Sequence, residues 1–210
     1  MAKQNVKNEG DERLESIETT LTRAEQFVID NQKAIIVVLA IMVVAVLAFF
    51  GVKKYYLEPR EKDAQAAIYH AEQYFENDNF ATALNGDGNY LGFVDVINEF
   101  GGTKTANLAK YYAGVSYLNT GDFNKAVEYL KSYKGKDVIV SSLALGALAD
   151  AYMELDNVAE AAKCYENAAV KSANSFTSPM YLLRAGMAYE MAGDYAKAIA
   201  AYNKIKADYP

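Results

Sequence analysis

The chain has 210 residues, of which 52% are hydrophobic, with 3 Pro, no Trp and a formal net charge of −6. This composition predicts an ordered protein, and an acidic balance without a basic stripe argues against nucleic acid as a partner. The single cysteine, Cys164, excludes an intramolecular disulfide framework, and the single histidine, His70, leaves too little for a metal cluster or a Ser/His/Asp triad. We therefore expect no catalysis, no cofactor and no small-molecule substrate.

The first 33 residues are an acidic leader with seven Asp/Glu against five Lys/Arg. Apolar side chains recur in it at spacings of three and four, which predicts an amphipathic helix. They are Leu14, Ile17, Leu21, Ala24 and Val28. Such a stripe is suited to seating a partner or a second copy of the chain, or to lying on a membrane surface. At about two heptads it is too short to establish a coiled coil.

Residues 34–52, "AIIVVLAIMVVAVLAFFGV", are nineteen consecutive residues without a polar side chain. As a helix they would span about 28 Å, enough to cross a bilayer. Lys33 precedes the run and "KKYY" at 53–56 follows it, and both flanks suit a membrane interface. The alternatives are a buried core helix and a cleaved signal peptide. The length and acidity of the leader favour an uncleaved signal anchor over a cleaved signal.

The flanking charges alone do not determine the orientation of this span in the membrane. Two basic residues lie close to it on the N-terminal side and four on the other, namely Arg23 and Lys33, then Lys53, Lys54, Arg60 and Lys62. The positive-inside rule then mildly favours a cytosolic C-terminal part, although long domains translocate largely regardless of flanking charge.

Two stretches after the span are nearly the same: "TGDFNKAVEYL" at 120–130 and "AGDYAKAIAAY" at 192–202. A third copy lies between them. The three copies comprise Gly114, Tyr117, Gly121, Ala126 and Leu130; Ala149, Tyr152, Asp156, Ala161, Tyr165 and Ala168; and Gly186, Tyr189, Gly193, Ala198, Tyr202 and Pro210. Their first tyrosines are 35 and then 37 residues apart. The pattern resembles the tetratricopeptide repeat, a unit of about 34 residues that forms two antiparallel helices.

Each shared position of the repeat has a physical reason. Small residues such as Gly114 and Ala126 let two helices approach closely, and the aromatic residues fill the space above them. Gly121 supplies the tight turn, and in the second copy Asp156 stands where the turn glycine would be. Because no single helix pair can bury its apolar face alone, each copy needs a neighbour.

A fourth, more degenerate copy precedes these. Its matching residues are Ala71, Tyr74, Phe80 and Ala83. It carries the extra segment "LNGDGNYLG" at 84–92, whose amide and acidic side chains alternate as in a calcium loop. An EF-hand requires Gly at the sixth position and Glu at the twelfth, where this chain has Tyr90 and Val96. We therefore expect a helix-breaking loop here, which reorients the next segment.

Together these elements predict an all-α fold, in which an N-terminal transmembrane helix is followed by a tetratricopeptide helix-pair superhelix. The expected domains are a cytoplasmic amphipathic segment at 1–33, a transmembrane signal anchor at 34–52 and a repeat domain at 53–210. Within the repeat domain we expect a degenerate repeat near 64–102 and further repeats near 107–140, 142–175 and 179–210.

The stretch "ALNGDGNYLGFVDVINEFGGTKTANLAKYYAG" at 83–114, behind an N-terminal span, resembles a Bacteroidota-type membrane tetratricopeptide family. The architecture is similar to that of the YfgM-like ancillary subunits of the Sec translocon. The resemblance implies a single-pass protein of the bacterial inner membrane, with a cytoplasmic N-terminus and periplasmic repeats. It further implies a non-catalytic adaptor that associates with the SecYEG translocon and a PpiD-like membrane chaperone, or with unfolded clients. The alternative is a structural scaffold of another cell-envelope complex.

In such repeats the first helix of each pair lines the concave face, so the repeat register predicts a protein-binding groove. Its residues are Leu108, Tyr111, Val115 and Leu118; Leu143, Ala147, Asp150 and Met153; and Met180, Leu183, Arg184, Met187 and Met191. Methionines adapt to varied shapes, which suits unfolded or helical segments. The equally weighted alternative is that a neighbouring helix fills the groove. Repeats that clamp a C-terminal carboxylate use five polar positions, of which only Arg184 agrees here, so no such clamp is expected.

Three further features complete the sequence. Cys164 is expected to pack as a small buried hydrophobe, and His70 to be a surface or boundary residue. The last predicted helix carries Ile199, Tyr202 and Ile205 on one face and is followed by Pro210. Because repeat arrays generally need a polar cap, we expect either that the natural chain continues or that a partner docks on this face.

Overall fold

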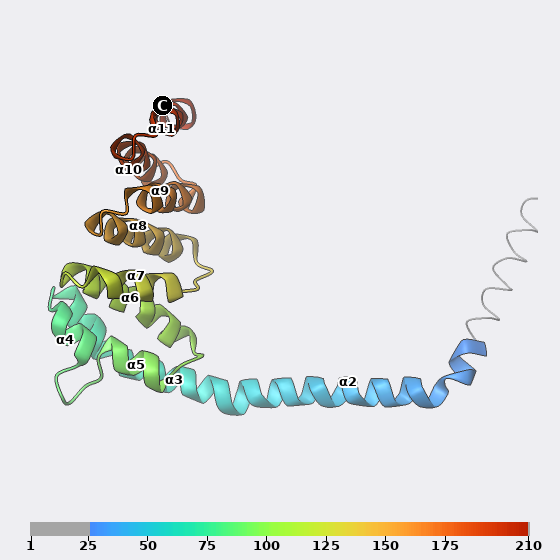
Figure 1. Cartoon of the computed structure of the whole chain (residues 1–210). Coiled ribbons are helices and arrows are strands. Elements are labelled where there is room, and N and C mark those ends of the chain that lie inside the picture. The colour runs from blue at the N-terminus through green and yellow to red at the C-terminus, as the bar shows by residue number, and fades with distance from the viewer. Residues whose placement is uncertain (1–25, 210) are drawn as a thin grey trace, which may run out of the picture. The chain divides into compact units, whose positions relative to one another are not determined.

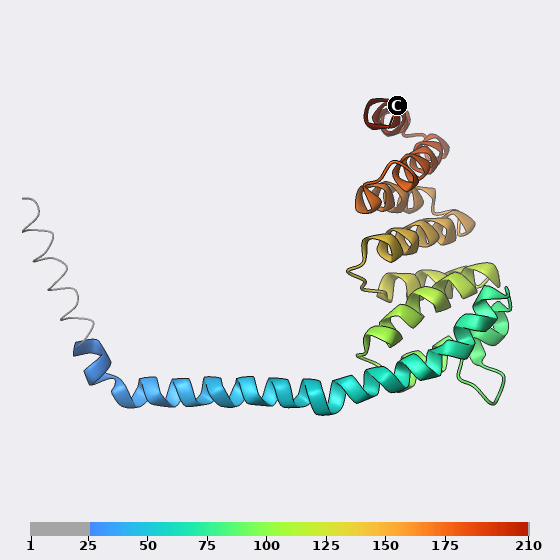
Figure 2. The ribbon, with the colours of Figure 1, turned by 180° about the vertical axis from the view of Figure 1, so that it is seen from behind.

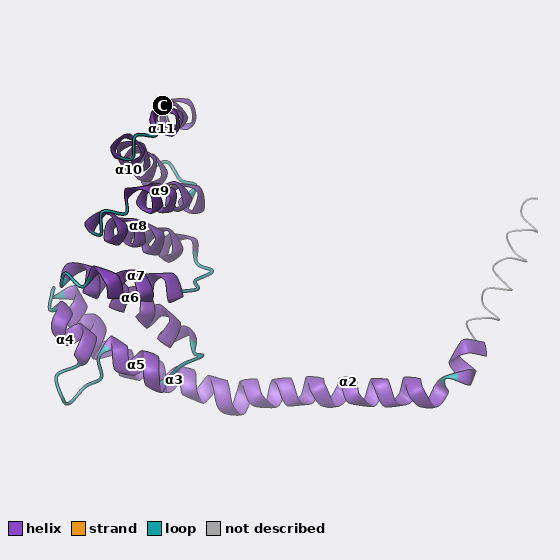
Figure 3. Ribbon diagram, in the orientation of Figure 1, coloured by secondary structure: helices purple, strands orange, loops and turns teal. Residues whose placement is uncertain are grey.

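A computed structural model describes residues 26–209, and those residues form only helices, turns and loops (Figure 3). The elements in chain order are α2 (Gln32–Val52), the π-helix η1 (Lys53–Leu57), α3 (Glu58–Glu76), α4 (Phe80–Asn85), α5 (Phe93–Glu99), α6 (Lys104–Asn119), α7 (Phe123–Ser132), α8 (Val138–Glu154), α9 (Val158–Ser172), α10 (Thr177–Met191) and α11 (Tyr195–Asp208). The predicted all-α fold is therefore confirmed.

The apolar run 34–52 lies within α2, none of whose residues is buried. Of the residues that the structure describes, only the helical stretch Gln32–Glu76 is long and apolar enough to cross a membrane. Most of the amphipathic leader, residues 1–25, lies outside the described residues. Of its predicted apolar stripe only Val28 is described, with 52% of its surface exposed.

The chain divides into two compact units that meet between Tyr56 and Leu57. The short π-helix η1, with the sequence KKYYL, includes both residues at this boundary. A π-helical turn is a local widening of an α-helix that frequently marks a functional position. Tyr55 in this turn is 80% exposed, as expected of a side chain that would lie at a membrane–water interface.

The unit from Leu57 onward is a stack of helix pairs, in which α6–α7, α8–α9 and α10–α11 follow one another (Figures 1 and 2). Successive helices pack on one another along the whole stack. Helices α6 and α8 each begin directly after an N-cap: the side chains of Thr103 and Asp137 accept hydrogen bonds from backbone N–H groups in the first turns of these helices. Such N-caps satisfy backbone N–H groups that have no partner within the helix.

The turn inside each helix pair is the same in all four copies. A residue with positive φ occupies each turn: Asp78 (57°), Gly121 (83°), Asp156 (56°) and Gly193 (76°). The next residue then donates its backbone N–H to the carbonyl of the repeat's tyrosine, at 2.8–3.0 Å, in the pairs Asn79–Tyr74, Asp122–Tyr117, Asn157–Tyr152 and Asp194–Tyr189. The interpretation of Asp156 as a substitute for the turn glycine is confirmed, because aspartate tolerates the left-handed region better than most residues.

The predicted close approach of paired helices is also present. A Cβ atom added to Gly114 would overlap Leu130 of α7, and one added to Gly186 would overlap the ring of Tyr202 in α11. In the middle copy the equivalent residue, Ala149, is fully buried. Because the side chains at these positions are small, large side chains of the facing helix fill the space between the two helices, and the interface is closely packed.

The degenerate copy differs because α4 stops after six residues. A loop follows, in which the Asp87 carboxylate accepts backbone N–H bonds from Asn89 (2.9 Å) and Tyr90 (2.8 Å) and a hydroxyl bond from Tyr74 (2.8 Å). The bonds from Tyr90, Tyr74 and Asn89 lower the pKa of Asp87. This aspartate therefore holds the loop in shape against α3, and the helix break expected from the sequence is observed.

Two clusters of buried side chains form the core of this unit. One lies among α3, α4, α5 and α6 around Phe93 and Val96, and the other runs from α7 to α11 around Leu182 and many alanines. Tyr117 of α6 packs against both clusters and so joins them.

A carboxylate fastens α3 to the start of α6. Glu61 accepts hydrogen bonds from the backbone N–H of Lys104 (2.6 Å), the backbone N–H of Thr105 (3.1 Å) and the Thr105 hydroxyl (2.7 Å). Desolvation alone would raise the pKa of Glu61, but these hydrogen bonds outweigh it and the pKa is lowered. A negative charge at a helix N-terminus is also favoured by the helix dipole.

Candidate protein-interaction surface

All of the residues predicted to line a groove lie on the first helices of the three regular pairs, α6, α8 and α10. Their surroundings differ from helix to helix. Those on α6 are partly buried, and Tyr111, Val115 and Leu118 pack against the core cluster. Burial raises the pKa of Tyr111 to about 12. The α6 part of the predicted groove is thus largely occupied by packing within the array.

The α10 part is open. Met180, Leu183, Met187 and Met191 are 38%, 49%, 53% and 67% exposed, and they recur at spacings of three and four along the helix. Tyr181, Leu182, Ala185 and four further residues of α10 are buried against neighbouring helices, whereas Arg184 and Glu190 are exposed beside the four apolar side chains. One side of α10 therefore holds the core together while the other presents a methionine-rich apolar stripe to solvent, which we call the α10 stripe.

On α8 the predicted residues fall between these extremes. Leu143 is 39% exposed, whereas Ala147 and Met153 are partly buried and pack against the core cluster. Leu143 is thus the exposed apolar member of the set on this helix.

Asp150 and Arg184, two predicted groove residues, pair with each other. The Arg184 guanidinium donates to Asp150 Oδ1 at 3.1 Å, and the Tyr165 hydroxyl donates a short hydrogen bond to the same oxygen. Burial and this bond raise the pKa of Tyr165 well above its usual range. The cluster joins α8, α9 and α10, which are the helices that carry these three side chains. The Arg184 guanidinium is therefore engaged in an ion pair within the array.

Sequence reasoning missed a group of exposed apolar residues at the start of α8 and before α10. Phe176 is 83% exposed, Ile139 68% and Val138 48%. They line a pocket of about 210 Å³ together with Ser142, Leu143, Ser172, Asn174 and Thr177. The repeat register predicts which residues of the first helices line the groove, and it assigns no role to helix starts or to the linkers between repeats. An available signal was an apolar pair, Val138 and Ile139, directly after an aspartate N-cap.

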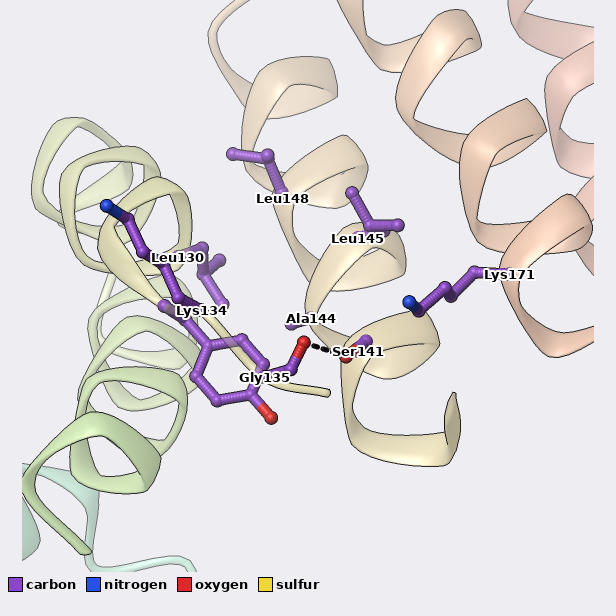
Figure 4. A pocket seen from close by; sticks show the side chains of 9 residues that line it. Leu130, Lys134, Gly135, Ser141, Ala144, Leu145, Leu148 and Lys171 are labelled. Carbon is purple, nitrogen blue, oxygen red and sulfur yellow. Dashed lines mark hydrogen bonds between the residues drawn. The ribbon is translucent and has the colours of Figure 1, made fainter. Parts of the chain in front are cut away.

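Two further pockets adjoin the linker between α7 and α8. The larger, about 560 Å³, is lined by the start of α6 and by the linker: Gly102, Thr103, Lys104, Asn107, Leu108, Tyr133, Lys134, Gly135, Lys136 and Asp137. The smaller, about 230 Å³, has an apolar floor of Leu130, Ala144, Leu145 and Leu148. In Figure 4 the Ser141 hydroxyl donates to the Gly135 carbonyl at 3.1 Å, and Lys171 extends from α9 toward this pocket.

Cys164 and His70, the two residues considered above for catalysis or metal binding, both pack against other parts of the chain. Cys164 is a free, buried cysteine on α9, and burial raises the pKa of its thiol, which disfavours the reactive thiolate. His70 is partly buried and stacks on Tyr90 of the inserted loop, with 3.5 Å between ring centroids. Among the described residues, no three His, Cys, Asp or Glu side chains are grouped so that they could hold a metal ion.

Comparison with known families agrees with the geometry. Two family models, both described as tetratricopeptide repeat, match residues 108–137 and 147–210. No curated protein and no solved structure matches the chain. The chain therefore contains tetratricopeptide repeats, a fold that serves protein–protein interaction, and its N-terminal apolar helix is compatible with a single-pass membrane anchor.

Proposed function

We propose that this protein is a membrane-tethered, non-catalytic adaptor that binds other proteins through the α10 stripe and the neighbouring Leu143. The observation that carries the proposal is the exposure of four large apolar side chains on one side of a helix whose other side is fully packed. Exposed apolar residues that gather in a patch commonly mark interaction sites. Flexible methionine side chains add tolerance of differently shaped partners.

The proposed partners are the SecYEG translocon, a PpiD-like membrane chaperone, or unfolded segments emerging near them. This part of the proposal comes from the resemblance in architecture to ancillary translocon subunits. The proposed location is the bacterial inner membrane, with a cytoplasmic N-terminus and periplasmic repeats. The proposed anchor is residues 34–52, and the proposed repeat domain is residues 53–210.

Site-specific photo-crosslinking in living cells tests the adaptor function. A benzophenone amino acid at Leu183 or Met187 should crosslink to a translocon subunit or a periplasmic chaperone. The matched control is Asn203, an exposed residue of α11, where no such product is expected. Products with cell-wall synthesis or division proteins would instead favour an envelope scaffold. If the α10 positions and Asn203 give the same products or none, the stripe is not the binding face.

Cysteine accessibility tests the orientation. Thr120 lies in the exposed turn between α6 and α7, and Cys164 is buried, so a Thr120→Cys change in a Cys164→Ser background offers one accessible thiol. In spheroplasts with an intact inner membrane, a membrane-impermeant maleimide should label this cysteine. Labelling that appears only after the membrane is opened would place the repeats in the cytosol.

A further inference from the structure

Successive junctions between helix pairs carry a pocket at the same position of the repeat. The first, which we call the basic pocket, lies where α6 begins and the 133–137 linker passes, and it has a volume of about 560 Å³. The second, the uncharged pocket, lies where α8 begins and the 173–176 linker passes, and it has a volume of about 210 Å³. Leu108 lines the first pocket and Leu143 the second, and their separation of 35 residues equals that of Tyr117 and Tyr152. The two pockets are therefore neighbours on one edge of the array.

The basic pocket is lined by three exposed lysines, Lys104, Lys134 and Lys136. Lys104 also interacts electrostatically with Glu61. Lys125, Lys163 and Lys197 form salt bridges of 2.6–3.1 Å with the acidic residue three positions before each of them, whereas no salt bridge between described residues involves Lys134 or Lys136.

The one carboxylate of the basic pocket, Asp137, is engaged as the N-cap of α8. It accepts the Val140 N–H at 2.8 Å. The pocket therefore presents positive charge beside the side chains of Leu108 and Tyr133, in a chain whose net charge is −6.

The uncharged pocket has the opposite character. None of the residues that line it is charged, and its rim includes Ile139 and Phe176, which are 68% and 83% exposed. Phe176 is the most exposed large apolar side chain among the described residues. If a partner covered this phenylalanine, its apolar surface would be removed from water, which is favourable in free energy.

We propose that this edge binds an extended acidic segment of a partner protein. Aspartate or glutamate side chains of the segment lie against Lys134 and Lys136, and an aromatic or aliphatic residue of the same segment covers Phe176 and enters the uncharged pocket. The inference extends the proposed adaptor function, and it concerns an edge built from helix starts and linkers rather than the α10 stripe.

The spacing of the two pockets sets the length of the segment. Helices α6 and α8 pack directly on each other, and packed helices lie about 8–10 Å apart. An extended chain advances about 3.3 Å per residue. About three residues should therefore separate the acidic part of the segment from its apolar anchor. Charge complementarity at the basic pocket favours an acidic ligand. The uncharged pocket favours a protein segment over nucleic acid, because it offers apolar surface and no cation.

Fluorescence anisotropy on the full chain in nanodiscs of zwitterionic lipid tests this inference. The probe is a labelled peptide with three glutamates, a three-residue glycine–serine spacer and a Phe-Leu pair. We expect saturable binding that weakens with added salt. Exposed ion pairs are individually weak, but the double change Lys134→Glu with Lys136→Glu replaces two attractions by repulsions and should lower affinity about tenfold. The change Phe176→Ser should lower it several-fold without altering the salt dependence.

Three controls separate a loss of the proposed contacts from effects of net charge, peptide composition and unfolding. The double change Lys204→Glu with Lys206→Glu alters net charge equally on exposed positions of α11 and should leave the affinity within about twofold. Peptides with glutamine in place of glutamate, or serine in place of Phe-Leu, should bind less tightly. Circular dichroism confirms that each variant keeps its helices.

The inference is overturned if the acidic peptide does not bind, if the glutamine peptide binds equally, or if both lysine double variants lose affinity alike. Competition by vesicles of anionic lipid, but not by unlabelled peptide, would assign the basic pocket to a lipid headgroup and also overturn it. Crosslinking at Met187 reports on the α10 stripe independently, so failure of the peptide assay and failure of the adaptor function are distinguishable.

Discussion

The pair α6–α7 and the block α8–α11 are built alike inside and differ outside. Between Lys104 and Asp137, a stretch described throughout, no large apolar side chain is exposed, whereas eleven are exposed between Val138 and Ile199. The first stretch carries six lysines and three carboxylates, and residues 138–209 carry six basic and eight acidic side chains. Both regions nevertheless share the tyrosine, the turn with positive φ and the small residues at the helix crossing.

This difference shows which positions of the repeat are free to vary. The interior of each pair is constrained by close packing, because a helix crossing over glycine or alanine has no room for a larger side chain. The surface has no such constraint, so one pair can become basic and the next apolar without loss of the fold. The stacked array then brings the two surfaces together along one edge.

The largest expected effect tests the shared interior. Ala126 of α7 and Ala161 of α9 are both fully buried at equivalent positions. Replacing either by Leu should overpack the helix crossing and lower the free energy of unfolding by about 1–3 kcal/mol. Thermal melts of the full chain followed by circular dichroism measure this. Ala200→Leu on exposed surface of α11 is the matched control. If both midpoints stay unchanged, the two regions do not share the interior described above.

The next effect separates the two regions at the turn. Gly121 has φ +83° with open space around its Cβ position, so Gly121→Ala should cost about 1 kcal/mol from backbone strain alone. Asp156 occupies the same turn in the next pair with φ 56°. Asp156→Gly should stabilise the fold by about 0.5 kcal/mol, because glycine adopts this conformation without strain. Urea titrations of both variants should give changes of opposite sign, and a shared sign would contradict the equivalence of the turns.

A smaller effect concerns how α6 is fastened to α3. The pKa of Glu61 is lowered from its ordinary value of 4.5, so its carboxylate stabilises the fold above pH 4.5, and that contribution is lost as pH falls through the lowered pKa. Glu61→Gln should melt earlier than the unaltered chain at neutral pH, and the two melting temperatures should converge in acid. Glu58→Gln, on the exposed first turn of α3, should reproduce the profile of the unaltered chain. Parallel curves for Glu61→Gln and the unaltered chain would contradict the role of the charge.

The smallest effect on stability is expected where the surfaces differ most. Leu183→Ser with Met187→Ser, and Lys134→Ser with Lys136→Ser, should each change stability by no more than about 0.5 kcal/mol per site, because all four side chains are exposed. Binding of a hydrophobic fluorescent dye to the chain in nanodiscs should fall in the first double variant and stay constant in the second. Equal dye binding in both would remove the contrast between an apolar and a basic surface.

The sequence by itself determined the features that depend on nearby residues. A run of apolar residues predicts a spanning helix, a residue that tolerates positive φ predicts a turn, and recurring small residues predict a helix crossing. Each of these follows from the conformation or size of a single residue and its spacing to the next copy. The helix pairs, the Asp156 turn and the loop after α4 could therefore be predicted without coordinates.

Only the tertiary structure decided which surface residues stay free and which meet. The repeat register placed Tyr111 and Met187 in one class, yet the first packs against the core and the second is exposed, because coverage depends on the neighbouring helices. Asp150 and Arg184 are 34 residues apart and form a salt bridge only when α8 and α10 are both in place. Ile139 and Phe176 share one pocket for the same reason, since a stacked array brings together residues that the chain keeps one repeat apart.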